Sequence, residues 1–394
     1  MKIAIEAQRI FRPNKHGMDF VALETIRCLQ KIDTKNEYFI FTGEGGDRCL
    51  EETPNMHIET LRCPTYPLWE QWALPRAVAR VKPDLLHCTS NTAPVWGRTP
   101  LVLTLHDIIF LEKQASRNKS SYQSLGRIYR RLVVPRILPK CRKIITVSQF
   151  ECDRIRTALG LDPERITAIY NGYNERFRPL DDVARTVGKY LSDPGYIFFL
   201  GNTDPKKNTS GTLRAYAEYV RRSEKPLPLL VADLREQAAE EILREIGAPE
   251  LRGMLRLPGY IPNGDLPAVY NGASAFLYTS LRESFGIPQL EAMACGTPVV
   301  TSNTSAIPEV AGPGAILVDP TSPTAIADAL LRLETDPAFR AEQVAYGLER
   351  VKLFSWDRRP GSCWRFTNRS ADRAQTRPPP RIVGAAVGTD RSGR

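Results

Sequence analysis

Two glutamates, Glu283 and Glu291, are separated by seven residues around a short turn. Gly286 interrupts the preceding apolar run, and Pro288 suits the first position of a helix, where its missing N–H costs nothing. Free N–H groups at such a helix start can bind phosphate or sugar hydroxyls. The pattern predicts a site for a polyhydroxylated ligand that carries phosphate. In the alternative interpretation, Glu291 only complements the helix dipole and Glu283 is solvated.

Two lysines form a second candidate group. Lys206 and Lys207 follow a glycine loop after the apolar run 196–200 and stand just before a helical pattern. Either ammonium group could neutralise a diphosphate held near that helix start. An ordinary pair of solvated lysines is the competing interpretation. Tyr260 lies in a turn, residues 259–264, that could line a base pocket or merely connect two elements.

The first half of the chain offers His106, which follows the apolar run 101–105. Ligands of parallel sheets bind beyond the carboxyl ends of the strands, so this position favours a functional role for His106. A structural histidine remains an equally good interpretation. Gly17 lies at the end of a polar loop, residues 12–17, after the first apolar run.

The elements that must position these residues are short apolar runs that alternate with helical patterns, including helices expected from about Asp19 and over 209–220. Continuous apolar strands of this kind predict parallel sheets covered on both faces. The alternation breaks near residue 180 and then restarts, which predicts two α/β domains in tandem. The expected strands are 2–7, 38–42, 85–89, 101–105, 143–147, 166–170, 196–200, 227–232, 255–258, 275–279, 299–301 and 316–318.

Composition is typical of a globular protein, with 394 residues, 42% hydrophobic and 25% charged. The length favours two domains. No apolar run approaches the roughly 20 residues that a membrane span needs. The chain reaches charged Glu6 too soon after Met1 for the apolar core of a signal peptide. The eight cysteines include no Cys-x-x-Cys pair, so we expect a reducing, cytoplasmic location.

The net charge of +10 is concentrated at the end of the chain. Residues 357–394 hold nine Arg, no Lys and three Asp, so they supply six of the ten net positive charges. The remainder is nearly balanced, and specific nucleic-acid binding is therefore not expected from charge.

A second basic segment, residues 117–143, holds nine Lys or Arg and no acidic residue. Leucine, isoleucine and valine side chains are interleaved at helical spacing. Such a helix can lie on an anionic membrane. The alternative is a helix packed on the core with a solvated basic side. The nine residues are Arg117, Lys119, Arg127, Arg130, Arg131, Arg136, Lys140, Arg142 and Lys143.

Residues 277–300 resemble the signature of the retaining GT-B glycosyltransferases of family 4 (glycosyl transferases group 1), including its E-x7-E spacing at Glu283 and Glu291. The resemblance covers roughly residues 1–356. Its further motifs are 104–107, 145–148, 170–172, 177–179, 201–208, 259–262, 305–312 and 317–320.

The resemblance implies the GT-B architecture, an α/β fold of two Rossmann-like domains whose parallel sheets face a central cleft. The expected divisions are an acceptor-binding domain 1–178, a linker 179–194, a nucleotide-sugar-binding domain 195–356 and an atypical basic tail 357–394. Relatives have a helix after Trp356 that crosses back to the first domain. The Arg- and Pro-rich tail predicts disorder instead, and hence weaker domain closure.

The resemblance also implies roles for single residues. Glu283 matches a glutamate that contacts the donor sugar, His106 a histidine that faces this sugar, and Lys207 a lysine that neutralises the leaving diphosphate. These three are the expected catalytic residues, and Glu291 is expected to accept hydrogen bonds from ribose. The expected donor-binding residues are Gly17, Lys206, Lys207, Tyr260, Ser284, Phe285, Gly286, Ile287 and Glu291.

The implied activity moves a hexosyl group from a GDP- or UDP-linked sugar, with GDP-mannose slightly preferred, to a saccharide or lipid-linked saccharide. Anomeric configuration is retained, as in polysaccharide biosynthesis, and neither a metal nor a cofactor is expected. The expected location is the cytoplasm or the inner face of the cell membrane. Two alternatives stay open: a non-catalytic sugar- or nucleotide-binding protein, and a glycoside hydrolase that uses Glu283 and Glu291.

Overall fold

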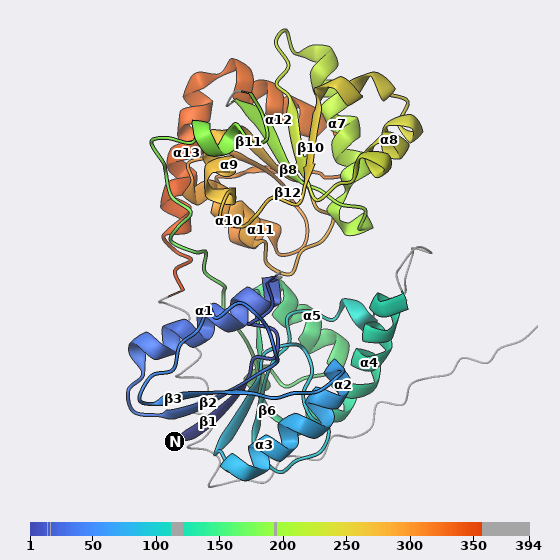
Figure 1. The fold of residues 1–394 in the computed structure, drawn as a ribbon. Coiled ribbons are helices and arrows are strands. Elements are labelled where there is room, and N and C mark those ends of the chain that lie inside the picture. The colour runs from blue at the N-terminus through green and yellow to red at the C-terminus, as the bar shows by residue number, and fades with distance from the viewer. Residues whose placement is uncertain (14, 16, 112–120, 193–194, 357–394) are drawn as a thin grey trace, which may run out of the picture.

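In the described part of the chain, two parallel sheets lie one above the other, each with helices packed on it (Figure 1). The computed structural model describes residues 1–13, 15, 17–111, 121–192 and 195–356. The predicted α/β class with two parallel sheets is confirmed. The basic tail 357–394 and residues 117–120 of the basic segment lie outside the described residues, so the predictions made for them are not addressed.

The first sheet has the order β3-β2-β1-β4-β5-β6-β7, and all its described pairings are parallel. β4 and β5 are central strands buried along their whole length. The sequence did not predict β3, a half-exposed edge strand without an apolar run. The strands are β1 Lys2–Glu6, β2 Glu37–Thr42, β3 Met56–Thr60, β4 Leu85–Cys88, β5 Leu101–Thr104, β6 Cys141–Thr146 and β7 Ile166–Ala168.

The second sheet has the order β10-β9-β8-β11-β12-β13, again parallel throughout the described pairings. All six of these strands were predicted, with ends that differ by no more than two residues. The strands are β8 Tyr196–Leu200, β9 Leu229–Ala232, β10 Leu255–Gly259, β11 Ala273–Tyr278, β12 Val299–Ser302 and β13 Ile316–Val318.

The helices connect and cover these strands. α1 begins two residues earlier than predicted, because Asp19 is buried in the first turn instead of capping it. A short π-helical stretch, η1, joins α2 to α3. Around the first sheet lie α1 Gly17–Ile32, α2 Tyr66–Leu68, η1 Trp69–Ala73, α3 Leu74–Val81, η2 Ile109–Leu111, α4 Ser121–Ile137, η3 Leu138–Lys140, α5 Gln149–Leu159 and η4 Pro163–Arg165. Around the second lie α6 Ala184–Val187, η5 Pro205–Lys207, α7 Thr209–Arg222, α8 Glu236–Glu245, η6 Pro249–Met254, α9 Leu266–Gly272, α10 Ile287–Ala294, α11 Ile307–Ala311, α12 Pro323–Thr335 and α13 Pro337–Val351.

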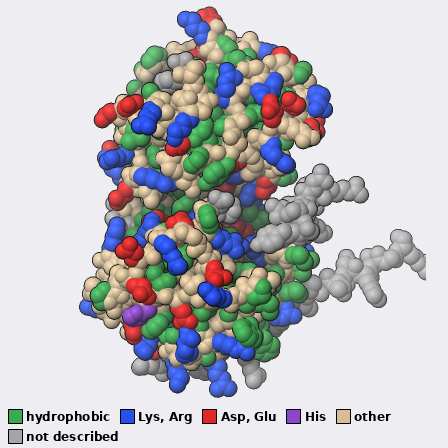
Figure 2. Space-filling model, in the orientation of Figure 1, with side chains coloured by type: hydrophobic (Ala, Val, Ile, Leu, Met, Phe, Trp, Pro, Cys, Tyr) green, Lys and Arg blue, Asp and Glu red, His purple; other side chains and the backbone are tan. Residues whose placement is uncertain are grey.

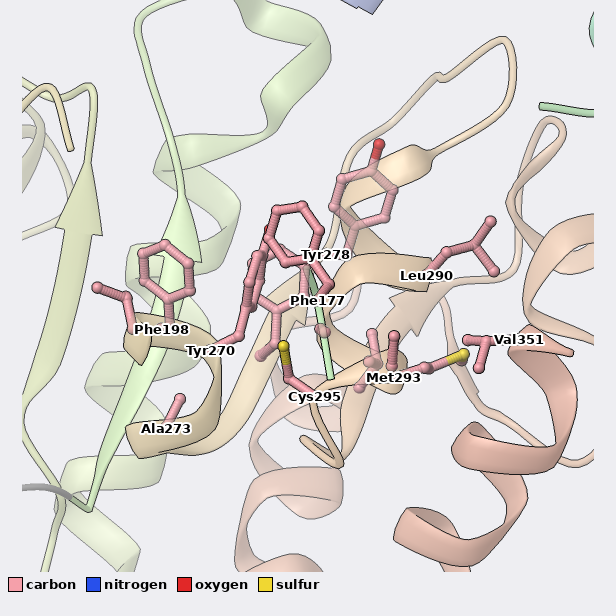
Figure 3. Close-up of a cluster of buried hydrophobic side chains, with 14 of the residues drawn as sticks. Phe177, Phe198, Tyr270, Ala273, Tyr278, Leu290, Met293, Cys295 and Val351 are labelled. Atoms are coloured by element: carbon pink, nitrogen blue, oxygen red, sulfur yellow. The ribbon is translucent and has the colours of Figure 1, made fainter. Parts of the chain in front are cut away.

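One buried cluster ties the second sheet to the segment that precedes it (Figure 3). Phe177 packs edge-on against Tyr270, with 5.9 Å between ring centroids, and Tyr270 packs in turn on Phe198 at 5.3 Å. Val187 and Leu191 are buried in the same cluster. Within the segment expected to be a linker, 179–194, Val187 and Leu191 therefore pack on the second unit, which is the second sheet with its helices.

The end of the described chain returns to the first unit, which is the first sheet with its helices. Tyr173 N–H donates to the Phe354 carbonyl at 3.3 Å, and Trp356 packs with Val21 and Cys28 of α1. A Cβ added to Gly172 would lie 2.4 Å from the Trp356 nitrogen, so this contact needs glycine. Residues 354–356 thus cross between the two units before the tail begins.

Candidate active site

The loop between β11 and α10 carries the first glutamate and ends at Gly286. Gly286 has φ +102°, a left-handed conformation that glycine tolerates best. A Cβ there would also lie 2.7 Å from Gln289 Nε2 and 3.1 Å from the Tyr278 ring. The predicted helix follows directly as α10, with Pro288 in its first turn, and Gly296 takes the left-handed conformation after its end.

Lys207 and Glu283 form an ion pair at the carboxyl edge of the second sheet. Lys207 Nζ lies 2.7 Å from Glu283 Oε1, and their side chains are only 20% and 15% exposed. The ammonium group also lies over the Tyr278 ring, 5.6 Å from its centroid. Partial burial strengthens such a pair and fixes the position of both groups. The structure therefore brings two of the three expected catalytic residues together.

Lys206 has a different environment from its neighbour. Its side chain is 42% exposed, and the nearest carboxylate, Asp204, lies 3.9 Å away. Its backbone carbonyl accepts from Leu281 N–H at 2.7 Å, which joins the lysine loop to the glutamate loop. Lys207, not Lys206, thus points its ammonium group at Glu283.

Glu291 lies on α10, close to the Tyr278 ring. Burial raises the pKa of Glu291 to about 7, while the Arg176 charge and the Tyr270 hydroxyl, 3.4 Å from Oε2, lower it. Burial and both carboxylates, Glu283 and Glu291, raise the pKa of the Tyr278 phenol well above its ordinary value. Two carboxylates thus flank one tyrosine beside a lysine, an arrangement that can bind hydroxyl groups and a neighbouring anion.

Other expected donor-binding residues have mixed positions. Tyr260 is exposed after β10, where its ring is accessible to a flat ligand. Phe285 is buried, its ring 6.0 Å from Tyr170 and 5.9 Å from Phe354, and Ile287 packs near Trp356. The buried Phe285 side chain therefore serves packing, whereas the Ile287 side chain is partly buried beside Trp356.

His106 and Gly17 lie in the first unit. His106 follows β5 and is buried, with Nε2 2.9 Å from the Thr89 carbonyl oxygen and its backbone N–H donating to Asn91 Oδ1 at 2.6 Å. These contacts fix the ring at the carboxyl edge of the first sheet. Gly17 is the first residue of α1, and a Cβ there would meet no atom within 4 Å.

The sequence did not predict the polar contacts that join the two units. Arg282 Nη2 lies 3.3 Å from Glu151 Oε1, and Ser148 Oγ donates to the Ser284 carbonyl at 2.8 Å. The Glu309 carboxylate contacts the start of α5. Residues 305–312 were noted as a family motif, which was the one available signal for Glu309.

Within the described residues, two other features are absent. No group of three His, Cys, Asp or Glu side chains is arranged to hold a metal ion there. No helix of that part of the chain is long and apolar enough to cross a membrane.

Two family models match consecutive parts of the chain. Residues 16–177 match glycosyltransferase family 4, and residues 184–350 match the glycosyl transferases group 1. The chain belongs to glycosyltransferase family 4. The second match contains the motif around Glu283 and Glu291, and the first contains the motifs at 104–107 and 145–148.

Curated relatives of this family 4 chain include the O-antigen chain mannosyltransferase B of Escherichia coli, 32% identical over 223 residues. That match covers 56% of this chain and 58% of the relative. A D-inositol 3-phosphate glycosyltransferase of Nocardioides is 26% identical over 66% of this chain and 60% of its own length. The chain thus spans about three fifths of the length of these two relatives, and 27% of the length of a serotype-specific mannosyltransferase WbdA of Escherichia coli.

Solved structures establish the GT-B fold of this family 4 chain. Sucrose-phosphate synthase of Thermosynechococcus elongatus superposes with a TM-score of 0.73 at 20% identity, over 93% of this chain and 98% of that one. Anabaena HepE, solved with UDP and glucose, superposes with a TM-score of 0.70 at 18% identity, over 94% of this chain and all of that one.

Proposed function

We propose that this chain transfers a hexosyl group from a nucleotide-sugar to a saccharide acceptor with retention of anomeric configuration. The observation that carries the proposal is the partly buried pair of Lys207 and Glu283 beside the start of α10. A donor sugar needs a hydrogen-bond acceptor for its hydroxyls, and its diphosphate needs positive charge. The pair and the helix start supply both within one loop system.

The reaction breaks the bond between the anomeric carbon and the diphosphate oxygen. Negative charge then develops on the leaving diphosphate, where Lys207 and the α10 N–H groups stabilise it without a metal ion. The acceptor oxygen forms its new bond on the same face of the sugar. The acceptor proton passes to the leaving phosphate oxygen, so no protein nucleophile is required.

The donor is proposed to be a GDP- or UDP-linked sugar, with GDP-mannose slightly preferred. Relatives named as mannosyltransferases support the sugar, and Anabaena HepE, solved with UDP-glucose, supports a nucleoside diphosphate. The acceptor is proposed to be a saccharide or lipid-linked saccharide, as the O-antigen names suggest. His106 would face the donor sugar from the first unit, and Tyr260 would contact the base.

A donor panel tests this proposal directly. Each nucleotide and nucleotide-sugar is added at about 100 times its Kd, where binding to the folded state adds about 2.7 kcal/mol of stability and raises the melting temperature. We expect the melting temperature to rise with one nucleoside diphosphate and with the nucleotide-sugar derived from it. Incubation with that nucleotide-sugar should then transfer the sugar to an oligosaccharide acceptor. Product analysis by NMR then gives the anomeric configuration.

The competing functions give different results in the same experiment. Release of free sugar from an oligosaccharide without any nucleotide would identify a hydrolase. Donor binding without transfer to any acceptor would identify a non-catalytic binding protein. An inverted product would exclude retention while leaving the transferase assignment intact.

A peripheral membrane contact through α4 is part of the proposal. Within this helix Val133, Val134 and Ile137 face the core, whereas the side chains of Leu125, Ile128 and Leu132 are exposed. The helix is joined to η1 by Gln71 Nε2, which donates to Tyr129 Oη at 2.8 Å. One side of α4 thus packs inward, as the core-packed interpretation predicted, and the exposed apolar side chains of its outer side support the proposed membrane contact.

The exposed aromatic residues extend this surface. Trp72 and Trp96 are 55% and 76% exposed, and each has a cation over its ring, Arg76 at 3.7 Å and Lys140 at 6.0 Å. Hydrophobic and basic side chains lie side by side over this part of the first unit (Figure 2). Tryptophan beside Lys or Arg is typical of a membrane interface, where each basic residue adds about 1 kcal/mol on anionic lipid.

Vesicle binding tests the contact. We expect sedimentation with vesicles of anionic phosphatidylglycerol but not with pure phosphatidylcholine. The double variant Trp72→Ser/Leu132→Ser should lower the partition coefficient at least about tenfold, because each side chain loses about 1.5 kcal/mol or more of apolar burial. Ile32→Ser, an exposed apolar residue of α1, is the matched control. Equal binding by the double variant would contradict the assignment.

A further inference from the structure

The first turn of α5 is one of the places where the second unit contacts the first. Glu309 of α11 reaches across, so that Oε1 accepts from Gln149 N–H at 2.6 Å and Oε2 from Phe150 N–H at 2.9 Å. These are N–H groups that a helix start cannot satisfy internally, and the positive end of the helix dipole favours a carboxylate there. Figure 1 shows α11 and α5 facing each other where the two units meet.

The same turn also holds the loop that carries Glu283. Ser148 Oγ donates to the Ser284 carbonyl at 2.8 Å, and Arg282 Nη2 lies 3.3 Å from Glu151 Oε1. Ser148 and Glu151 are fully buried. The residues immediately before and after Glu283 are therefore fixed by the first unit, although Glu283 itself pairs with Lys207 in the second.

Inside the second unit, Glu309 and the Glu283 loop are linked. Glu283 N–H donates to Ser305 Oγ at 3.0 Å, and Ala306 N–H approaches the Glu283 carbonyl at 3.4 Å. The Arg350 guanidinium donates to the Glu309 carbonyl at 2.7 Å, which anchors α11 to α13. The contact at α5 and the position of Glu283 therefore belong to one connected set of bonds.

We propose that Glu309 is a positioning residue, which docks on α5 when the two units close and thereby sets the Glu283 loop for the donor sugar. The inference rests on the proposed transferase function. When the units separate, both the carboxylate and the α5 N–H groups become solvated. Docking then requires closure, and a smaller closed fraction weakens donor binding in proportion.

The variant Glu309→Gln tests this role. It keeps the shape but loses the charge and turns an amide N–H group toward one helix N–H donor. We expect the Kd for the nucleotide-sugar to rise about tenfold or more, because charge-assisted bonds are lost and the closed fraction falls. The Kd for the nucleotide alone, held within the second unit, should change less than about twofold. Glu309→Asp, which keeps the charge on a shorter side chain, should recover part of the loss.

Domain separation gives a readout that does not depend on turnover. Spin labels on exposed positions of α3 and α8 should show a larger separated fraction in Glu309→Gln than in the parent, with nucleotide-sugar present. Glu342→Gln, an exposed glutamate of α13, is the matched control. An unchanged distance distribution together with unchanged nucleotide-sugar affinity would overturn the proposal. If the parent itself transfers no sugar, only the function fails, since the distance measurement still reports docking.

Discussion

Replacement of Lys207 by alanine is expected to lower kcat by about 100- to 1,000-fold, as removal of one preorganised charge-stabilising donor does in other enzymes. The reason is that negative charge grows on the leaving diphosphate as the glycosidic bond breaks, and the Lys207 ammonium is already fixed 2.7 Å from Glu283. Affinity for the acceptor should change little, because the acceptor does not carry this charge. Steady-state kinetics with both substrates varied measures the two effects separately.

Two further lysine variants complete this experiment. Lys206→Ala should have a smaller effect than Lys207→Ala, because the Lys206 side chain is more exposed and does not contact Glu283. Lys225→Ala, an exposed lysine in the loop after α7, is the control for loss of one surface charge. A Lys206→Ala variant that loses more activity than Lys207→Ala would transfer the role to Lys206.

The second large effect is expected at Glu291. Glu291→Ala should weaken nucleotide binding by about 10- to 100-fold, which corresponds to the roughly 1.5 to 3 kcal/mol of a hydrogen bond to a charged group. Isothermal calorimetry measures the change, and circular dichroism checks that the fold survives. Unchanged affinity would remove Glu291 from the nucleotide site.

We expect Glu291 to make both nucleotide affinity and stability depend on pH. Burial raises the pKa of Glu291 to about 7, so its carboxyl is largely protonated below neutral pH in the free protein. Ribose hydroxyls donate to a carboxylate, so nucleotide affinity should rise as pH increases through 7 and then level off. For stability the sign is opposite: a raised carboxyl pKa means that the free protein loses stability as pH rises from the ordinary value toward 7. Glu291→Gln should abolish both trends.

The sequence predicted the central elements well because their signals are local. β4, β5, β8, β9, β11 and β12 are largely apolar runs buried over nearly their whole length, and their composition alone marks them. β3 was missed because an edge strand with one exposed side carries no such run. The predicted start of α1 was two residues too late, because Asp19 resembles a helix cap in the sequence although it is buried in the first turn.

The candidate site was predictable in part for the same reason. Gly286, Pro288 and the two glutamates lie within one short stretch, so spacing and family resemblance sufficed. The ion pair that distinguishes Lys207 from Lys206 joins residues 76 positions apart, and only the folded chain brings them together. The bonds of Glu309 to α5 span about 160 positions, beyond the reach of any local pattern.

The crossing of chain segments between the two units has a consequence for dividing the protein. Phe177, Val187 and Leu191 precede β8 but complete the core of the second sheet, whereas Trp356 follows α13 but packs on α1. A fragment cut at residue 195 would leave the Tyr270 ring without its Phe177 neighbour. A functional split into two separately produced pieces would therefore have to place its breaks near residues 172 and 352. The peptide that follows residue 352 would then be supplied together with the first piece, because Trp356 packs on α1.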